Sequence, residues 1–152
     1  MALVFLGLGT NLGEKEQLLN DTIIQISLQL GEVLRQSSFF ESKPWGFISD
    51  NDFLNAVILV NTNLSPIKLL ESIQTIEKQM GRMSKSKFGY ADRLIDVDIL
   101  FYDSRIINLL ELKIPHPLII ERDFVLVPLC EIAPDFVHPV IGLKISEISL
   151  NN

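Results

Sequence analysis

Four stretches of the chain carry the apolar patterns of β-strands. Residues 2–8 form a short, nearly continuous apolar run, and residues 53–62 are apolar on two faces with one polar position, Asn55, set in one of them. From residue 95 to residue 101, apolar side chains occupy every second position, which is the spacing of one strand face. The chain therefore predicts strands at residues 2–8, 33–40, 53–62 and 95–101.

Two stretches between these strands have the period of an amphipathic helix. In the first, apolar residues recur at intervals of three and four and a glycine follows them: Leu19, Ile23, Ile26, Leu30 and Gly31. The second begins with Ser65 as N-cap and Pro66 at the first helical position, and it ends at Gly81. Its apolar stripe consists of Leu69, Ile73, Ile76 and Met80.

The other segments are predicted from turn residues and weaker periods. Residues 7–13 are glycine-rich and predict a tight turn, and residues 44–52 predict a loop. Residues 82–92 are polar and cationic without a period, which predicts a mobile loop. Residues 106–114 predict a weak hairpin and residues 121–133 a short helix broken at Pro128, whereas the tail after Pro139 carries little signal.

This order of elements, β-α-β-β-α-β, predicts an α+β fold with a ferredoxin-like βαββαβ core. We expect a mostly antiparallel sheet with helices packed on one face, followed by a C-terminal hairpin and short helices. The 152 residues contain no internal repeat and no linker, so a single domain over residues 1–152 is expected.

Composition narrows the function classes. The chain has 13 basic and 19 acidic residues, a net charge of −6, which disfavours non-specific binding to nucleic acid or to an anionic membrane. No apolar run approaches the roughly 18 residues of a membrane span. Cys130 is the only cysteine, so no intramolecular disulfide forms. The apolar start of the chain lacks a basic region and is expected to be a buried strand rather than a signal peptide, so a reducing, cytoplasmic location is expected by default.

An aspartate pair in the last predicted strand is the strongest chemical signal. Asp96 and Asp98 are two residues apart, which places both carboxylates on one face while the other face is apolar. Two close carboxylates repel each other, and a hard cation such as Mg²⁺ between them relieves that repulsion. The alternative is two solvated acids on the open face of a sheet.

Cations surround this pair in an otherwise acidic chain. Four precede it within 12 residues, and four basic or titratable residues follow it: Arg82, Lys85, Lys87, Arg93, Arg105, Lys113, His116 and Arg122. Arginine is suited to phosphate oxygens, so this arrangement is consistent with a Mg²⁺-bound polyphosphate. The alternative is a surface loop whose charges balance nearby acids. Neither a dinucleotide fingerprint, which would need glycine where Leu12 stands, nor a P-loop is present.

Residues 42–55 have the contents of a pocket for a planar heterocycle. Trp45 and Phe53 can stack on a ring, and the amide of Asn55 offers donors and an acceptor to a ring edge. The alternative is that Trp45 plugs a loop and Phe53 belongs to the core. Phe124 is ambiguous in the same way.

Eight segments, in order, resemble the 6-hydroxymethyl-7,8-dihydropterin pyrophosphokinases of folate biosynthesis. They are LGTNLG (8–13), KPWG (43–46), DFLNA (52–56), IEKQMGR (76–82), RLIDVDIL (93–100), IPHP (114–117), ERDFVLVPL (121–129) and EIAP (131–134). Each is weak alone, but the series with compatible spacing is specific. The segment between 82 and 93 departs from the family pattern, because Asp92 stands where the family usually has proline and Ser84 where it often has arginine.

The resemblance implies an enzyme that transfers pyrophosphate from ATP to the hydroxymethyl group of the reduced pterin and releases AMP. It implies that Asp96 and Asp98 hold two Mg²⁺ ions and that, with Arg82 and Arg93, they carry catalysis. The implied ATP-binding residues are Gln74, Glu77, Arg82, Arg93, Ile99, Lys113, His116 and Arg122. The implied pterin-binding residues are Ser42, Lys43, Trp45, Phe53, Asn55, Tyr90 and Phe124. The expected partners are these small molecules only, with the chain a monomer or associated with other folate enzymes.

Two other functions remain open at the level of sequence. A non-catalytic ligand-binding module would account for the fold and the pocket, but it would leave the aspartate pair beside a cationic loop unexplained. Another Mg²⁺-dependent nucleotidyl or glycosyl transferase could use the aspartate pair, although the aromatic pocket favours a flat acceptor.

Overall fold

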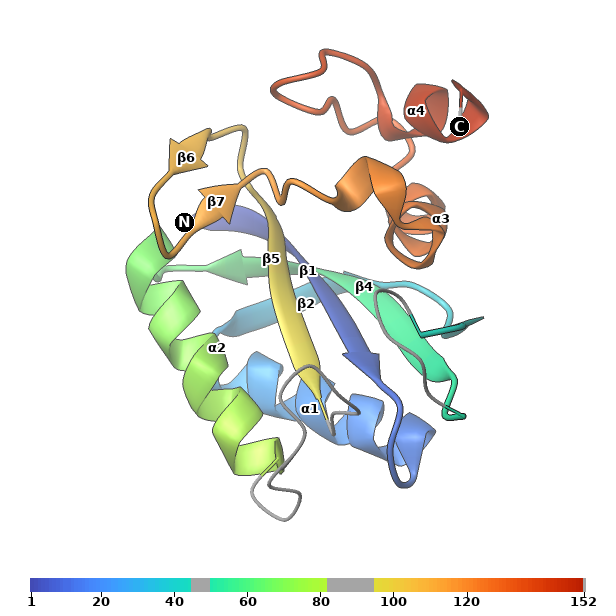
Figure 1. Ribbon diagram of the computed structural model, residues 1–152. Coiled ribbons are helices and arrows are strands. Elements are labelled where there is room, and N and C mark those ends of the chain that lie inside the picture. Colours follow the sequence, from blue (N-terminus) through green and yellow to red (C-terminus); the bar gives the residue numbers. More distant parts are fainter. Residues whose placement is uncertain (45–49, 82–94, 152) are drawn as a thin grey trace.

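An antiparallel sheet forms the centre of the molecule, seen in the computed structural model of Figure 1. The structure describes residues 1–44, 50–81 and 95–151. The sheet order is β2 (Gly31–Gln36), β4 (Phe53–Thr62), β1 (Ala2–Thr10), β5 (Asp96–Tyr102), and the short β3 (Phe40–Ser42) also pairs with β4. Every pairing is antiparallel, which confirms the predicted α+β class and sheet type.

Two long helices connect the strands. α1 (Lys15–Gln29) leads from β1 to β2, and α2 (Pro66–Gly81) leads from β4 to β5. In both cases a third strand lies between the two connected ones, which is the split βαβ connectivity. The finer ferredoxin-like assignment stays a prediction. At the end of α1, Gly31 has φ +154°, and a side chain there would collide with the carbonyl oxygen of Asn61, so glycine is required.

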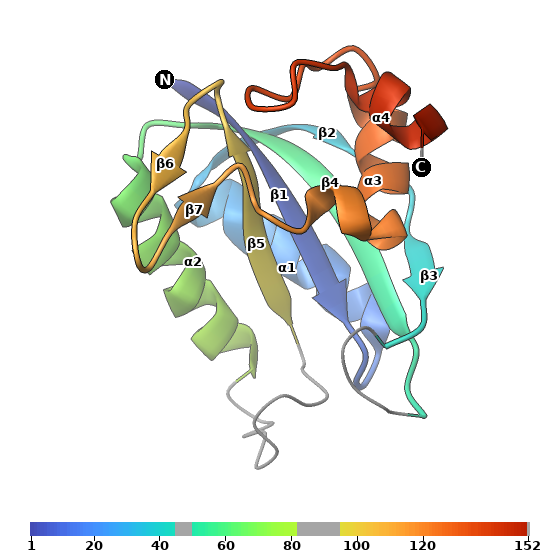
Figure 2. The same ribbon diagram turned by 45° about the horizontal axis from the view of Figure 1, so that its top comes forward.

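Helices cover both faces of the sheet, not one face as the sequence predicted. Figures 1 and 2 show α1 and α2 on one side and α3 (Asp123–Ile132) with α4 (Ile145–Asn151) on the other. The reason is visible in β4, where Ile58 and Val60 pack towards α1 and α2 while Val57 and Leu59 pack towards α3. Both faces of the strand are apolar, so both require a cover.

The alternation predicted for residues 95–101 fails at its end. A β-bulge in the β1–β5 ladder pairs Phe5 with Phe101 and the next residue, Leu6, with Ile99, which leaves Leu100 as the extra residue. Leu100 and Phe101 therefore both pack on the α3 side, whereas Val97 and Ile99 pack on the α1–α2 side.

Three local predictions need correction. The strand expected at 33–40 is two strands, β2 and β3, separated where Ser37 exchanges hydrogen bonds with Val57. Pro128 does not break α3, because the buried residues on both sides of it, such as Leu126 and Leu129, hold the helix against the sheet at the cost of one backbone hydrogen bond. The tail contains α4, whose Ile145 and Ile148 complete the same cluster.

The remaining elements are short. β6 (Ile107–Asn108) and β7 (Lys113–Ile114) form the predicted hairpin, and the 3₁₀ helix η1 (Ile119–Glu121) precedes α3. Within the described ranges no helix is both long and apolar enough to cross a membrane. The predicted mobile loop 82–92 lies outside the described residues.

Candidate functional site

A cavity of about 360 Å³ opens where β1 ends and β4 and β5 begin. Its walls come from the ends of these three strands, from β3 and the residue after it, and from the segment that leads through η1 into α3. The lining residues are Gly7, Leu8, Gly9, Ser42, Lys43, Phe53, Asn55, Ala56, Val57, Asp96, Asp98, His116, Pro117, Leu118, Arg122, Phe124 and Val125. Segments distant in sequence therefore meet around one space.

The floor of the cavity is the bare backbone of the central strand. Gly7 and Gly9 lie within β1, so the turn predicted for residues 7–13 begins later than expected, after Thr10. Because successive residues of a strand face opposite sides of the sheet, both glycines lie on one face, the face of the cavity. A Cβ at Gly9 would lie 3.0 Å from Oδ1 of Asn55, whereas one at Gly7 would meet the side chain of Leu100 at an ordinary 3.5 Å. Glycine at position 9 thus makes room for the side chain of Asn55.

The acidic end of the cavity is formed by β5. Asp96 pairs with Gly9 and Asp98 with Gly7, so each carboxylate stands beside a strand position without a side chain. Both aspartates are partly buried rather than solvated on an open sheet face. Nη1 of Arg122 lies 3.9 Å from Oδ2 of Asp98, and its guanidinium lies 5.6 Å from the ring centre of Phe124. Arg122 therefore links the acidic end to the aromatic part of the wall.

His116 adds a polar group that is neutral near physiological pH. Its backbone N–H donates to the carbonyl oxygen of Leu100, and its ring Nδ1 accepts a hydrogen bond from the N–H of Leu118. Burial, with the nearby Arg122 cation, lowers the pKa of His116, while Asp96 acts in the opposite direction. Because Nδ1 is an acceptor, the proton of the neutral ring is on Nε2, which makes that atom a hydrogen-bond donor.

The opposite end of the cavity has a fixed amide. Asn55 is 4% exposed, and its Nδ2 donates to the carbonyl oxygen of Phe40 at 2.9 Å and to Oγ of Ser42 at 2.8 Å. A carbonyl oxygen can only accept, so this pairing fixes which side of the amide is nitrogen. The amide oxygen is therefore directed towards Gly9 and the cavity, and the hydroxyl proton of Ser42 can be donated to a ligand.

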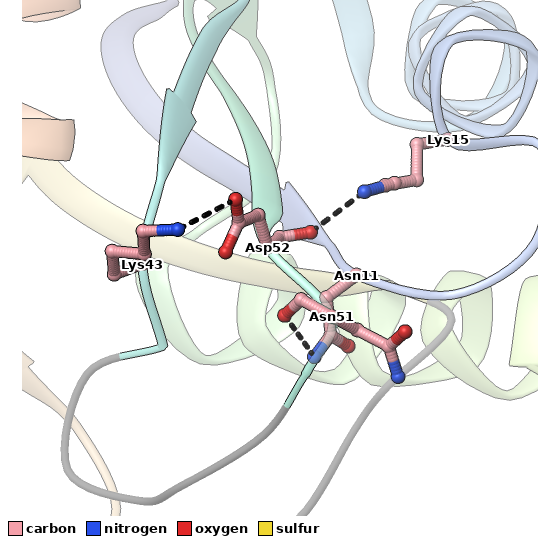
Figure 3. Close-up of polar contacts among 5 residues, drawn as sticks. All are labelled: Asn11, Lys15, Lys43, Asn51 and Asp52. Atoms are coloured by element: carbon pink, nitrogen blue, oxygen red, sulfur yellow. Dashed lines mark hydrogen bonds and ion pairs between the residues drawn. The ribbon is translucent and has the colours of Figure 1, made fainter.

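Polar contacts hold the entrance to β4 in place (Figure 3). Nζ of Lys15 donates to the carbonyl oxygen of Asp52 at 2.8 Å, and Nδ2 of Asn11 donates to the carbonyl oxygen of Asn51 at 3.3 Å. Nζ of Lys43 lies 3.2 Å from Oδ2 of Asp52. The connection between β1 and α1 thus anchors the residues immediately before the cavity-lining Phe53.

Most of the chain is similar to known proteins. The sequence profile of the family described as 7,8-dihydro-6-hydroxymethylpterin-pyrophosphokinase (HPPK) matches residues 5–134. The chain belongs to this family. It is 43% identical over 141 residues to the 2-amino-4-hydroxy-6-hydroxymethyldihydropteridine pyrophosphokinase of Porphyromonas gingivalis, covering 91% of this chain and 95% of that protein. To the protein of the same name from Aquifex aeolicus it is 40% identical over 152 residues, covering 100% and 93%.

Relatives also include longer proteins. The chain is 46% identical over 143 residues to the folic acid synthesis protein fol1 of Pneumocystis carinii, covering 94% of this chain but only 19% of that protein. The wild-type Plasmodium falciparum HPPK-DHPS with pteroate has a TM-score of 0.79 at 17% identity, covering 99% of this chain and 44% of that one. At this identity the structural likeness shows the fold alone.

The cavity brings together most of the residues that the sequence resemblance assigns to the pterin pocket. It also includes part of the ATP site that the resemblance implies. The wall includes Ser42, Lys43, Phe53, Asn55 and Phe124 of the expected pterin pocket, and Asp96, Asp98, His116 and Arg122 of the expected metal and ATP site. The expected residues Trp45, Arg82, Tyr90 and Arg93 lie outside the described residues. Their roles as pterin or ATP ligands stay predictions.

Four further residues expected at the ATP site do not line this cavity. Gln74 is exposed on α2, and Ile99 is 5% exposed in the cluster with α1 and α2. Nζ of Lys113 donates to Oδ1 of Asn108 across the β6–β7 hairpin. Glu77 is also absent from the wall, and one of its carboxylate oxygens accepts a backbone hydrogen bond from β5.

Sequence reasoning missed two parts of this pyrophosphokinase-family site. The first is the glycine floor, which could have been recognised because Gly7 and Gly9 are two residues apart inside an apolar strand. The second is the contribution of Pro117 and Leu118, which follow His116 along the wall. No local pattern signals those two residues, because their place depends on the path of the chain into α3.

Proposed function

We propose that this chain transfers the terminal pyrophosphate of ATP to the hydroxymethyl group of 6-hydroxymethyl-7,8-dihydropterin, giving AMP and the pterin diphosphate. The observation that carries the proposal is that one cavity joins two chemically different ends. The β4 side has the amide of Asn55 bound to the hydroxyl of Ser42, and the β5 side has two carboxylates with the guanidinium of Arg122 beside them. The imidazole of His116 and the rings of Phe53 and Phe124 also line the cavity. A flat, hydrogen-bonding acceptor and an anionic donor that requires metal would fit this combination.

The pterin would occupy the end that contains Asn55. Its ring edge carries N–H groups, and the oxygen of Asn55 supplies a buried acceptor while Ser42 supplies a donor. Phe53 and Phe124 also line the cavity and offer ring faces for stacking. The two hydrogen bonds from the Asn55 amide hold its oxygen in one orientation before any ligand arrives, which reduces the entropic cost of binding.

The triphosphate would occupy the end that contains Asp96 and Asp98. Two carboxylates on one strand face fit the preference of Mg²⁺ for hard oxygen ligands, with phosphate oxygens and water completing its coordination. When bound, Mg²⁺ ions would neutralise the charge of the triphosphate, and the expected number is two. Arg122 can pair with phosphate oxygens, and the neutral His116 can donate from Nε2.

The chemical step needs orientation more than covalent participation by the protein. The hydroxymethyl oxygen bonds to the β-phosphorus as the bond from that phosphorus to the oxygen bridging the α-phosphate breaks. AMP leaves with the bridging oxygen, and the alcohol proton passes to solvent. The cavity residues hold the two reactants in line, and we assign no general base. The single cysteine is consistent with a reducing, cytoplasmic setting. The chain would act as a monomer or in association with other folate enzymes.

The decisive experiment is incubation of the protein with ATP, Mg²⁺ and the reduced hydroxymethylpterin, followed by quantification of nucleotides and pterins. AMP should appear in equal amount to the pterin diphosphate, and omission of the pterin should abolish AMP formation. ADP in place of AMP would overturn the assigned reaction class. Tight binding of both ligands without any product would favour the non-catalytic binding module.

A further inference from the structure

The edge of β5 is held at the residue between the two aspartates. Oε2 of Glu77 accepts a hydrogen bond of 2.9 Å from the backbone N–H of Val97. β5 pairs with β1 on one side, and among the described residues no strand of this sheet lies on its other side. The strand ladder therefore offers no acceptor to the N–H of Val97, and the carboxylate of Glu77 provides one.

The direction of successive N–H groups along β5 relates this contact to the two aspartates. Neighbouring residues of a strand direct their N–H groups to opposite edges. Because the N–H of Val97 points to Glu77, the N–H groups of Asp96 and Asp98 point to β1. The segment is thus held alternately from both edges, and Glu77 supplies the outer contact.

Glu77 is itself held firmly. It belongs to α2, whose neighbouring Ile73 and Ile76 are 1% and 0% exposed. These side chains pack in the same apolar cluster as Val97 and Ile99 of β5. The helix and the strand therefore share a core, so packing fixes the helix backbone that carries Glu77 relative to the strand.

We propose that Glu77 is a positioning residue that fixes the spacing and direction of the Asp96 and Asp98 carboxylates for their cation, by binding the backbone between them. The identity of the nucleotide in this inference rests on the proposed function. The hydrogen bond between Glu77 and Val97 is independent of that function. Groups that orient metal ligands in this way typically change metal affinity or activity about 10- to 100-fold when they are removed.

Two substitutions at one position separate positioning from charge. Glu77→Gln keeps an oxygen that can accept from Val97 and loses the negative charge, whereas Glu77→Ala loses both. Glu71→Ala is the matched control, since Glu71 lies on the same helix and contacts Lys68 at the surface. Thermal unfolding of the three variants would verify that each is folded before comparison.

The first measurement is hydrogen exchange of the Val97 amide in the protein without ligand or metal. We expect exchange to accelerate roughly tenfold or more in Glu77→Ala, as for loss of one hydrogen bond to a charged group. Glu77→Gln and Glu71→Ala should retain protection. Unchanged protection in Glu77→Ala would overturn the proposal, and this test is independent of whether the wild-type protein forms AMP.

The second measurement is the Mg²⁺ concentration needed for half-maximal binding of a non-hydrolysable ATP analogue. Glu77→Ala should require about 10- to 100-fold more Mg²⁺, while Glu77→Gln should stay near the wild type. If both variants lose Mg²⁺ affinity equally although Val97 stays protected in Glu77→Gln, the carboxylate acts through its charge and the proposal is wrong. Absence of AMP formation by the wild type would refute the proposed function alone.

Discussion

Replacing Gly9 with alanine tests whether the bare backbone of β1 is needed for the pterin. The added Cβ would lie 3.0 Å from Oδ1 of Asn55 and 3.7 Å from Cδ1 of Phe53. The amide of Asn55 cannot turn away easily, because its nitrogen is bound to Phe40 and Ser42. The substitution should therefore displace the Asn55 oxygen, which faces the cavity.

The expected cost to folding is small. Weakening one hydrogen bond of Asn55 costs about 0.5–1.5 kcal/mol. Alanine at a position with compatible backbone angles returns about 0.4–1 kcal/mol by restricting the unfolded chain. The free energy of unfolding should thus change by no more than about 1 kcal/mol, which is a shift of about 2–4 °C in Tm for a chain of this size.

The expected cost to pterin binding is much larger. A buried donor of the ligand that loses its acceptor costs about 1–3 kcal/mol. That corresponds to a Kd about 5- to 150-fold higher. Calorimetric titration with the pterin, in the presence of Mg²⁺ and a non-hydrolysable ATP analogue, would measure it. Binding of the analogue alone should be nearly unchanged.

Gly7→Ala is the matched control, because the atoms nearest to its Cβ would belong to the side chain of Leu100, at an ordinary contact distance of 3.5 Å. It should leave the pterin Kd near the wild-type value. A Gly9→Ala variant that binds the pterin as tightly as the wild type would refute the reasoning. Equal losses in both variants would mean that the cavity is blocked in general and that the Asn55 oxygen is not the decisive contact.

Three further substitutions probe the acidic end and a buried imidazole. Asp96→Ala and Asp98→Ala should each abolish most AMP formation. The Tm without ligand should be equal or slightly higher, because like-charge repulsion is relieved and the 3.9 Å pair between Asp98 and Arg122 is weak. Near-normal turnover at saturating Mg²⁺ would contradict the metal assignment. Burial lowers the pKa of His138 from 6.5, and its Nδ1 accepts from the N–H groups of Val140 and Ile141. As the pH falls, the imidazole of His138 is therefore protonated in the unfolded chain before it is protonated in the folded chain. The free energy of unfolding that depends on this group is full above about pH 6.5 and falls as the pH drops below it. Urea unfolding across this range should show a shallower pH dependence in His138→Gln, and an unaltered dependence would contradict the assignment.

The sequence predicts those features that depend on local period or on residue type. Helices α1 and α2 and the strands β1, β4 and β5 follow from apolar spacing, with ends close to those observed. The cavity residues Asn55, Asp96 and Asp98 were recognisable because a polar side chain inside an apolar strand is costly unless it has a partner or a function.

Features that depend on tertiary contacts were not predictable in the same way. α4 has only seven residues and exists because Ile145 and Ile148 find the apolar cluster under α3. The contact from Glu77 to Val97 joins residues 20 positions apart through the packing of α2 on the sheet edge. Pro128 is helical because its neighbours are buried, which overrides the local preference.

The bulge in β5 connects the packing under α3 with the wall of the cavity. With the extra residue Leu100, the chain directs Asp98 into the cavity and still places Phe101 against α3, while the Leu100 carbonyl oxygen receives the N–H of His116. Without Leu100, Phe101 would follow Ile99 directly, so Asp98 and Phe101 would keep their faces in an unbroken ladder. What Leu100 adds is a side chain in the cluster under α3 and the acceptor that places His116 at the cavity. One extra residue thus couples the apolar packing on the far side of the sheet to the position of a polar group in the cavity wall.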